Sequence, residues 1–290
     1  AARKLHGSGE VVFIDIRDIR ELNRDGRVPG AFHCPRGMLE FWIDPASKYH
    51  KDVFAQDKKF VFFCAAGARS ALATQIAVSS LTLLICDMRY SSWSLRPWIA
   101  MKVLGVEFSE VLLPLYQPNS AEQVLRYSPT GKVPALVDGQ TVVWESLAIL
   151  DYLTDRFRGL PMWPNELPAR GMARAVAAEM HAGFGPLRKH CPMNMMRDPK
   201  KPRDIPPDVM ANVTRIDAIW TQAREKFGKG GPFLFGAFSG ADAMYAPVVS
   251  RFASYSIPVS KTSKDYMDVM MGLPAWKEWQ ASASTETWIM

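Results

Sequence analysis

Two short apolar runs near the start of the chain have the pattern of buried strands. Residues 11–15 (Val-Val-Phe-Ile-Asp) and 60–64 (Phe-Val-Phe-Phe-Cys) are apolar at successive positions rather than at every second one. A strand of a parallel sheet is covered on both faces, so it needs apolar residues throughout. The stretch between the runs is polar and rich in Gly and Pro, as turns are. Residues 70–77 predict a helix, and the segment is therefore expected to be α/β.

A second series of strands and helices begins at residue 81. The pattern predicts a strand at 81–86, a helix at 94–104 with Ser94 as its N-cap and Gly105 after its end, and a second strand at 111–114. Serine before an apolar helical stretch is a common cap because its hydroxyl accepts a bond from an unpaired backbone N–H.

The same unit continues with a predicted hairpin. Residues 133–137 and 141–144 are apolar and flank Asp138-Gly139, a strong signal for a tight turn. A helix is predicted at 146–157. The order β-α-β-(helix)-β-β-α indicates a mixed sheet within residues 81–160.

Strand signals are weak after Pro161, and helical periodicity takes their place. Long helices are predicted at 169–189, 207–227 and 241–255. Ser239 and Asp242 have the spacing of a capping box, with Asp in place of Glu. The pattern therefore divides the chain into residues 1–80 (α/β), 81–160 (α+β) and 161–290 (all-α).

Composition agrees with a folded chain of about two domains. Of the 290 residues 48% are hydrophobic and 22% charged, which excludes wholesale disorder. No apolar run approaches the length of a membrane span, and residues 1–7 lack the apolar core of a secretory signal. The net charge of +6 is dispersed along the chain. Neither a nucleic-acid nor a membrane partner is expected.

The cysteines point to free thiols. Cys34, Cys64, Cys86 and Cys191 lie far apart, without a CxxC motif and without the spacing of a metal site. Four cysteines are too few for a disulfide scaffold of this length. We therefore expect no metal and a reducing, cytoplasmic setting.

The loop Cys64-Ala-Ala-Gly-Ala-Arg-Ser70 is placed for anion chemistry. It lies between a predicted buried strand and a predicted helix, where backbone N–H groups and the helix N-terminus favour a thiolate over a thiol. Arg69 adds a cation. Cys64 and Arg69 are thus candidate catalytic residues.

This segment resembles a rhodanese-like sulfurtransferase domain. The resemblance rests on Asp15-Ile-Arg17, on residues 26–31 (Gly-Arg-Val-Pro-Gly-Ala) and on the Cys64–Arg69 loop. It implies that Cys64 carries a persulfide. Such domains continue after the loop helix with a further strand and a Gly-rich tail, whereas residues 77–80 run directly into the next predicted strand. We therefore expect the domain to be incomplete at its C-terminal end.

Hydroxyl groups gather at the second strand-to-helix turn, in Tyr90-Ser-Ser-Trp-Ser94. A hydroxyl at this position donates a hydrogen bond to a substrate thiolate, and the helix dipole strengthens the interaction. If Ser94 caps the helix, Ser91 and Ser92 lie upstream of the cap and face the ligand.

Two further motifs suit a peptide-like ligand. Val133-Pro134 opens a strand, where a cis bond would bend the chain and expose backbone groups. Glu145-Ser146 lies at the next strand-to-helix turn and suits an ammonium and a carboxylate.

Together these motifs make residues 81–290 resemble a cytosolic glutathione transferase of the zeta-like, serine type. The resemblance implies a thioredoxin-like domain followed by a helical domain, glutathione as co-substrate and a homodimer. It implies that Ser91 activates the thiol, with Ser92 as the alternative. It also implies a glutathione site whose backbone and side-chain contacts come from Lys132, Val133, Pro134, Glu145 and Ser146.

The resemblance departs from the zeta class at Trp93, where zeta enzymes carry a Cys. The indole changes the size and polarity of the pocket, so isomerase activity is not expected to carry over. His181 and Arg188 are seven residues apart in the predicted helix 169–189 and would share a face. With Trp93 they form a candidate co-substrate site for an anionic acceptor.

The sequence thus predicts a transferase that joins glutathione to small electrophiles and carries a persulfide-forming segment. Two alternatives remain open. One is a coupled sulfurtransferase that passes sulfane sulfur from Cys64 to glutathione. The other is a non-catalytic module that binds glutathione or a partner, since this fold also serves binding roles.

Overall fold

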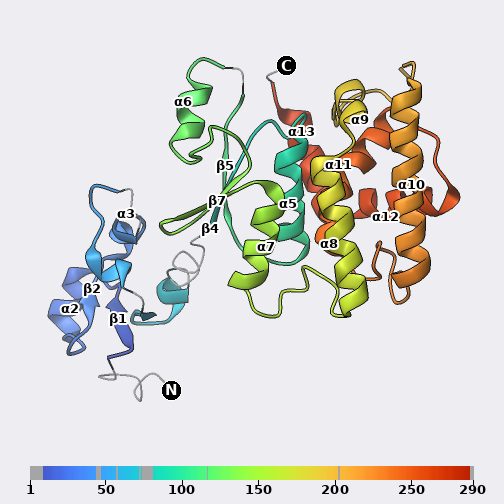
Figure 1. Ribbon diagram of the computed structural model, residues 1–290. Helices are drawn as coiled ribbons and strands as arrows, with labels where there is room; N and C mark the ends of the chain where they lie inside the picture. The colour runs from blue at the N-terminus through green and yellow to red at the C-terminus, as the bar shows by residue number, and fades with distance from the viewer. Residues whose placement is uncertain are drawn as a thin grey trace. The chain divides into compact units, whose positions relative to one another are not determined.

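The computed structural model describes residues 9–43, 47–56, 58–71, 73, 81–115, 117–201 and 203–287 (Figure 1). The chain forms two compact units, and apart from the turn 138–141 their boundary follows Leu81. No helix of the described residues is long and apolar enough to cross a membrane.

The first unit contains a parallel sheet with the order β2-β1-β3. β1 (Val11–Asp15) pairs with β3 (Lys59–Phe63) in the register Ile14 to Phe62, and with β2 (Phe32–His33). The strand predicted at 11–15 is confirmed, and the strand predicted at 60–64 begins and ends one residue earlier. The two-residue β2 is too short for a pattern to reveal. Most of the helix predicted at 70–77 lies outside the described residues.

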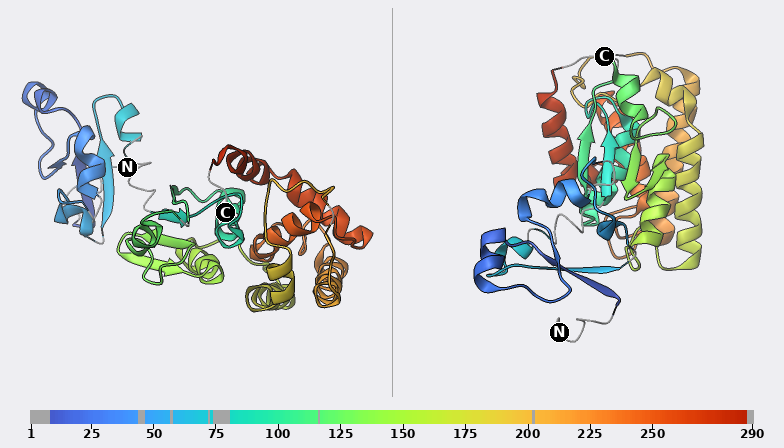
Figure 2. Two further views of the ribbon diagram at one scale, coloured as in Figure 1. Left: turned by 90° about the horizontal axis from the view of Figure 1, so that it is seen from above. Right: turned by 90° about the vertical axis from the view of Figure 1, so that its left-hand side faces the viewer.

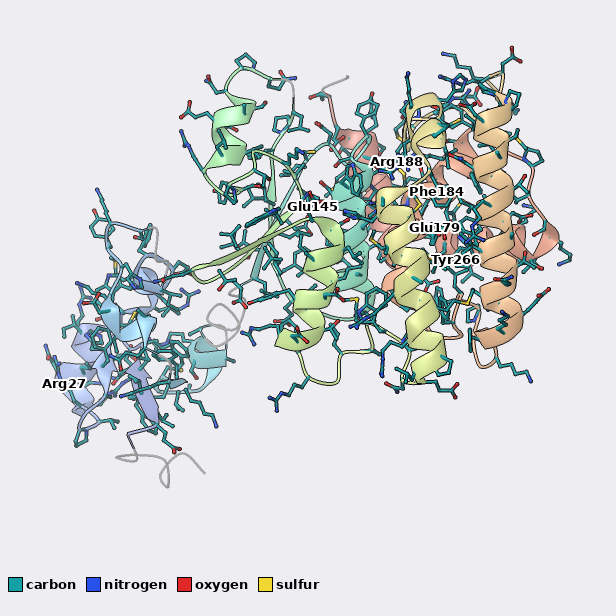
Figure 3. The ribbon with its side chains drawn as sticks, in the orientation of Figure 1. Arg27, Glu145, Glu179, Phe184, Arg188 and Tyr266 are labelled. Carbon is teal, nitrogen blue, oxygen red and sulfur yellow. The ribbon has the colours of Figure 1, made fainter. Side chains whose placement is uncertain are left out.

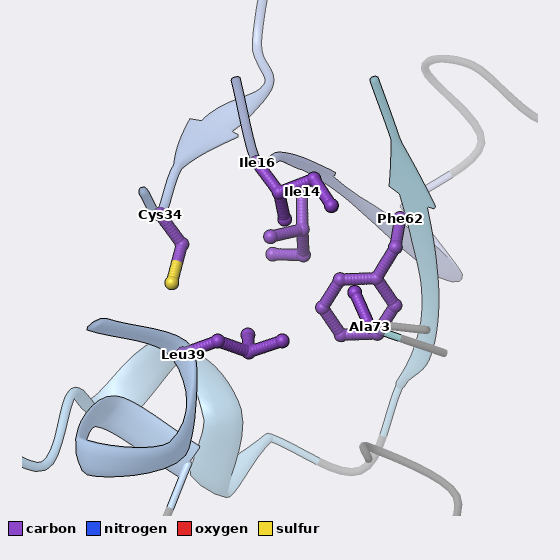
Figure 4. Packing of buried hydrophobic residues seen from close by; sticks show 6 residues of the cluster. All are labelled: Ile14, Ile16, Cys34, Leu39, Phe62 and Ala73. Atoms are coloured by element: carbon purple, nitrogen blue, oxygen red, sulfur yellow. The ribbon is translucent and has the colours of Figure 1, made fainter. Parts of the chain in front are cut away.

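One face of this sheet contributes to a small core. Ile14 and Phe62 from the strands meet side chains of the flanking segments, with α3 (Leu39–Ile43) supplying Leu39 (Figure 4). α2 (Ile19–Asp25) begins with a capping box in which Asp18 and Glu21 exchange bonds with the backbone. The short 3-10 helices η1 (Arg36–Met38) and η2 (Asp52–Ala55) complete the unit.

The second unit begins with a four-stranded sheet in the order β5-β4-β6-β7. Its strands are β4 (Leu81–Ile85), β5 (Ser109–Leu112), β6 (Ala135–Asp138) and β7 (Thr141–Trp144), and its helices are α5 (Ser92–Val103), α6 (Ser120–Leu125) and α7 (Ser146–Arg156). β4 and β5 run parallel. The predicted β-α-β-(helix)-β-β-α order is confirmed. The turn between β6 and β7 is centred on Gly139-Gln140 rather than on Asp138-Gly139, because Gly139 has the positive φ of 58° that tight hairpins require.

Where the structure describes the rest of the chain, six helices follow: α8 (Leu167–Ala182), α9 (Gly185–His190), α10 (Pro207–Phe227), α11 (Gly240–Ser254), α12 (Lys261–Gly272) and α13 (Pro274–Thr285). α11 is buried along almost its whole length and packs against α5 and α8 (Figures 1 and 2). The predicted capping box of Ser239 and Asp242 is present at its start. Individual helices corresponding to α12 and α13 were not predicted from the sequence, which indicated only that residues 161–290 are all-α.

The helix predicted at 169–189 is wrong, because the chain breaks between α8 and α9. Phe184 has a left-handed φ of 59°, and Pro186 lies in the first turn of α9. A Cβ at Gly183 would lie 2.8 Å from the carbonyl oxygen of Glu179, so only glycine fits at the end of α8. His181 and Arg188 therefore lie on two helices and do not share one helix face. Phe184, at the break, and Arg188 are labelled in Figure 3.

Candidate active site

Cys64 follows directly after β3, at the head of the loop that the sequence singled out. The backbone N–H of Gly67 donates to Sγ of Cys64 at 3.1 Å, and Sγ lies 3.6 Å from Oγ of Ser70. Gly67 has a φ of 83°, which turns the chain back over the thiol. Burial raises the pKa of the thiol, but the hydrogen bonds from Ser70 and the loop amides outweigh it and lower the pKa to about 7. The loop therefore holds a large thiolate fraction at neutral pH.

Arg69 is held by an acid that the sequence analysis missed. Its two terminal nitrogens donate to the two carboxylate oxygens of Glu21, each at 2.6 Å. This fork-to-fork pair fixes the guanidinium next to the loop. The Asp18–Glu21 capping-box spacing was the available signal, but it does not reveal that the carboxylate also binds Arg69.

The Asp15-Ile-Arg17 motif is a buried ion pair that supports the unit. Arg17 donates to Asp15 at 2.6 and 2.8 Å and to the carbonyl oxygen of Gly26 at 3.0 Å. Asp15 ends β1, so this pair ties the strand to the turn at Gly26. The motif therefore supports the frame of the first unit.

The serine motif of the second unit differs from the prediction in one respect. Ser91, and not Ser94, is the N-cap of α5: its Oγ accepts from the backbone N–H of Ser94 at 3.3 Å and donates to Oγ of Ser94 at 2.8 Å. Ser94 is fully buried, and its Oγ also accepts from the N–H of Cys86 at 3.2 Å. Ser92 is the first residue of the helix. Ser91 therefore lies at the cap rather than upstream of it.

The loop before Ser91 is anchored by the C-terminal segment, which the sequence analysis missed. The carboxylate of Glu286 accepts from the N–H groups of Met88 and Arg89 at 2.5 and 3.0 Å. Nε1 of Trp279 on α13 donates to the carbonyl oxygen of Met88 at 2.7 Å. These contacts span nearly 200 positions of sequence, so no local pattern predicts them.

Two neighbouring cavities lie beside this loop and share Trp93, Lys132 and Val133. The first, of about 310 Å³, is lined by Cys86, Asp87, Tyr90, Ser91, Ser92, Trp93, Leu115, Gly131, Lys132 and Val133. The second, of about 270 Å³, is lined by Trp93, Thr130, Lys132, Val133, Pro134, Trp144 and Glu145. The Val133–Pro134 bond is cis. The fold thus brings most of the predicted glutathione-site residues around adjoining cavities.

Glu145 and Ser146 differ in what they present to the cavities. Glu145 lines the second cavity with a strained, positive φ of 68°, and its Oε2 lies 3.6 Å from Nε2 of His181. Backbone strain of this kind is common where a side chain must be aimed at a ligand. Ser146 is fully buried, and its Oγ contacts the sulfur of Met244 at 3.8 Å. Its side chain therefore faces the core.

Trp93 is surrounded by cationic and polar side chains from three helices. The ring centroid of His181 lies 5.3 Å from that of Trp93, and the guanidinium carbon of Arg188 lies 5.2 Å from it. A third neighbour, Arg96, was not singled out from the sequence and lies at 4.0 Å. The sequence analysis placed His181 and Arg188 on one helix face. They lie on two helices instead, and the break between α8 and α9 still brings both of them to Trp93.

Arg188 and His181 are also constrained by their surroundings. Nη2 of Arg188 donates to the carbonyl oxygens of His181, Met180 and Gly183, which closes the C-terminal end of α8. Burial lowers the pKa of His181, the nearby Glu145 opposes this, and Arg96 and Arg188 lower it further. The imidazole is therefore neutral at physiological pH. Among the described residues, no three acidic, His or Cys side chains are placed to hold a metal ion.

Models of known families match three segments of the chain. "Rhodanese-like domain" matches residues 1–99, "Glutathione S-transferase, N-terminal domain" matches 90–156, and "Glutathione S-transferase, C-terminal domain" matches 174–280. The first two matches overlap at 90–99, the beginning of the serine motif and α5.

Curated relatives share less than 30% sequence identity with this chain in the two examples that follow. A zeta class glutathione S-transferase of Euphorbia esula is 28% identical over 156 residues, which are 53% of this chain and 66% of that protein. Glutathione S-transferase 1 of Dianthus caryophyllus is 29% identical over 109 residues, 37% of this chain and 49% of that protein. The chain thus spans from about half to about two thirds of the length of these relatives.

A solved structure shows the same fold. The glutathione transferase homolog from Burkholderia with bound glutathione superposes with a TM-score of 0.53 at 18% identity, covering 71% of this chain and 99% of that one. The second unit therefore has the thioredoxin-like and helical domains of a glutathione transferase. The chain therefore combines segments that match the N-terminal and C-terminal domains of glutathione S-transferases with a preceding segment that matches a rhodanese-like domain.

Proposed function

We propose that the protein joins the thiol of glutathione to a small electrophile in the cavities beside Ser91. The observation that carries this proposal is the adjoining pair of cavities. One is lined by the serine at the N-terminus of α5, and the other by the cis-proline and Glu145, with Trp93 common to both. This arrangement offers a place for a thiolate, an extended backbone and an ammonium group.

The proposed glutathione contacts follow from the chemistry of each position. Before the cis bond, the backbone of Val133 pairs with the cysteinyl residue. Glu145, half exposed, binds the γ-glutamyl ammonium. Lys132 approaches the glycyl carboxylate. The contribution of Ser146 is limited to its backbone N–H at the start of α7, because its hydroxyl faces Met244.

In the proposed reaction, Ser91 holds the thiolate. Its hydroxyl turns from Oγ of Ser94 to the sulfur, while the first N–H groups of α5 add a favourable field. The glutathione sulfur then forms a bond to the electrophilic carbon with its own electron pair, and the displaced group leaves with the bonding pair. Glu286 and Trp279 act only by holding the loop that places Ser91.

Turnover separates this proposal from a binding module. Purified full-length protein is mixed with glutathione and 1-chloro-2,4-dinitrobenzene, and conjugate formation is followed by absorbance. Binding of S-methylglutathione is measured by calorimetry in parallel. Conjugation above the uncatalysed rate supports the transferase. Binding without any turnover would instead establish a module that only binds glutathione.

A second candidate function is favoured by the lowered pKa of Cys64. The thiolate attacks the sulfane sulfur of thiosulfate, the S–S bond breaks, and sulfite leaves with the electron pair. A glutathione thiolate then attacks the outer sulfur of the persulfide and releases the Cys64 thiolate. Intact mass after incubation with thiosulfate tests the first step: a gain of one sulfur atom, absent in Cys64→Ser, is required.

A further inference from the structure

Trp93 is one of three described residues that line both cavities beside Ser91. It lies in the first turn of α5, and it contributes to the cavity of about 310 Å³ that contains Ser91 and to the cavity of about 270 Å³ that contains Glu145. The other two shared residues, Lys132 and Val133, already contact the glycyl and cysteinyl parts of glutathione in the proposed function. Trp93 is the shared residue without an assigned contact, so its role requires an explanation.

The indole is stacked against a buried cation. Arg96 lies in the same helix and is 0% exposed, and its guanidinium carbon lies 4.0 Å from the centroid of the Trp93 ring. Within the described part of the chain, none of its guanidinium nitrogens has a hydrogen-bond partner. A cation–π contact is strongest where both groups are shielded from water, and a buried charge that loses its partner is costly. A shift of the indole away from Arg96 is therefore unfavourable.

Two groups from the helical part of the second unit hold the same ring. The guanidinium carbon of Arg188 on α9 lies 5.2 Å from the Trp93 centroid, and the ring of His181 on α8 meets the indole edge to face at 5.3 Å. Arg188 is itself anchored, because its Nη2 donates to the carbonyl oxygens of Met180 and His181 at 3.3 and 3.0 Å. A change of the Trp93 rotamer would break contacts with side chains of three helices at once, so the packing fixes the indole in place.

The fixed ring limits the space beside the glutathione sulfur. The cavity that contains Ser91, of about 310 Å³, is near the lower end of the roughly 300–1,000 Å³ that small-molecule pockets occupy. In the proposed function, the sulfur and the glycyl end of glutathione fill part of this cavity. An apolar cavity of about 150 Å³ is enough for one benzene ring. The remainder of the cavity, which Trp93, Tyr90 and Leu115 line, therefore accepts one ring and not two.

We infer that Trp93 determines the specificity for the second substrate: held by Arg96, Arg188 and His181, its indole is a fixed wall that admits electrophiles with a single ring or smaller and excludes those with a second ring at the reacting carbon. This inference rests on the proposed transferase function and deepens it. Because it concerns the size of the group next to the sulfur, it can be measured by binding alone.

Two glutathione derivatives that differ in one ring test the wall without turnover. Calorimetry on the full chain compares S-benzylglutathione with S-(diphenylmethyl)glutathione. In the unaltered protein, we expect the second ring to lower the affinity about tenfold or more, because it overlaps the indole. In Trp93→Ala this difference should disappear. Trp93→Phe keeps an aromatic face for Arg96 but is smaller, so it should reduce the difference in part, and it decides the test if Trp93→Ala does not fold.

Trp144→Ala is the matched control, because Trp144 lines the cavity that contains Glu145 and not the cavity that contains Ser91. It should preserve the difference between the two derivatives even where both affinities change. Arg96→Met leaves the indole in place but removes the cation stacked on it, so the difference should become smaller. Melting temperatures establish that each variant is folded.

The inference is overturned if the unaltered protein binds both derivatives equally, if the difference persists in Trp93→Ala and Trp93→Phe or in Arg96→Met, or if Trp144→Ala abolishes it as Trp93→Ala does. The proposed function fails separately. Binding of S-benzylglutathione with no conjugation of 1-chloro-2,4-dinitrobenzene would remove the transferase proposal and leave the wall, whereas no binding of any glutathione derivative, S-methylglutathione included, would remove both.

Discussion

Oγ of Ser91 donates a hydrogen bond to Oγ of Ser94 at 2.8 Å and accepts one from the backbone N–H of the same residue. The proposed catalytic hydroxyl is therefore also the N-cap of α5. Its proton is donated to Oγ of Ser94 until a thiolate offers a stronger acceptor. The lone pair that accepts from the backbone N–H of Ser94 keeps that bond throughout. Catalysis and helix stability at this position thus depend on different parts of one hydroxyl group.

Because Ser91 has two roles, different substitutions at this position can separate helix capping from the proposed stabilisation of the thiolate. Ser91→Ala is expected to lose both functions: about 1 kcal/mol of stability from the cap, and conjugation reduced by less than the roughly 10²–10³-fold typical of a lost oxyanion donor, because a thiolate is a softer acceptor. Ser91→Asp keeps the capping acceptor but donates nothing to a thiolate. It should unfold at nearly the normal temperature and have very low turnover.

Ser92→Ala is the matched test of the neighbouring hydroxyl. Steady-state rates with glutathione and 1-chloro-2,4-dinitrobenzene, together with thermal melts, are compared across the three variants. If Ser92→Ala abolishes turnover while Ser91→Ala keeps it, the thiol-activating role belongs to Ser92. If neither changes the rate, a serine does not activate the thiol.

Cys64 is expected to be alkylated before the other three cysteines. Burial raises the pKa of Cys34 and of Cys86 to about 12 and also raises the pKa of Cys191, whereas that of Cys64 is about 7. Because the thiolate is the reactive form, the iodoacetamide rate at Cys64 should rise with pH through about 7 and then level off. Peptide mass spectrometry after limiting reagent gives the order and the pH profile.

Ser70→Ala provides the control for the cause of that shift. Without the hydroxyl next to Sγ, the pKa of Cys64 should increase and the midpoint of its alkylation profile should move to higher pH. The same midpoint in Ser70→Ala and in the unaltered protein would show that the loop amides alone set the pKa.

Cyanide-dependent transfer of sulfur from thiosulfate is expected to be weak or absent. Among the described residues, the next strand after the Cys64 loop is β4, which lies between β5 and β6 in the sheet of the second unit and does not extend β2-β1-β3. If the domain is incomplete at its C-terminal end, as the sequence predicts, its open sheet edge and partial pocket should hold thiosulfate poorly. A thiocyanate assay measures the activity, and strong thiocyanate formation that disappears in Cys64→Ser would contradict this expectation.

The second unit is expected to form a homodimer in solution. Leu125 and Trp144, which are 56% and 42% exposed, are candidate contacts of such an interface. Light scattering should give twice the chain mass of 32.5 kDa at micromolar concentration. Leu125→Arg should weaken the dimer, while Phe41→Arg, a change at an exposed residue of the first unit, should not. A single-chain mass for the unaltered protein would exclude a stable dimer.

Local chemistry was enough to predict much of the frame. Residues 11–15 form β1, as the apolar run 11–14 predicted, with Ile14 buried and Val11, Val12 and Phe13 partly buried. Val133-Pro134 and the Ser239–Asp242 capping box were also identified correctly, since cis-proline and capping geometry depend on adjacent residues. The two resemblances rested on the same kind of short, ordered motif.

Only the tertiary structure decided two kinds of feature. The first is contact between residues that are distant in sequence, and the second is a backbone angle that cannot be predicted from the type of residue. The left-handed Phe184 divides a continuous helical pattern, and this break brings Arg188 to Trp93. Glu21 fixes Arg69, Glu286 fixes the loop before Ser91, and Arg96 is buried without acceptors. The sequence by itself determined the elements and the motifs, because their energies are local. The partners of each charge were decided by packing, because burial and distance exist only once the chain is folded.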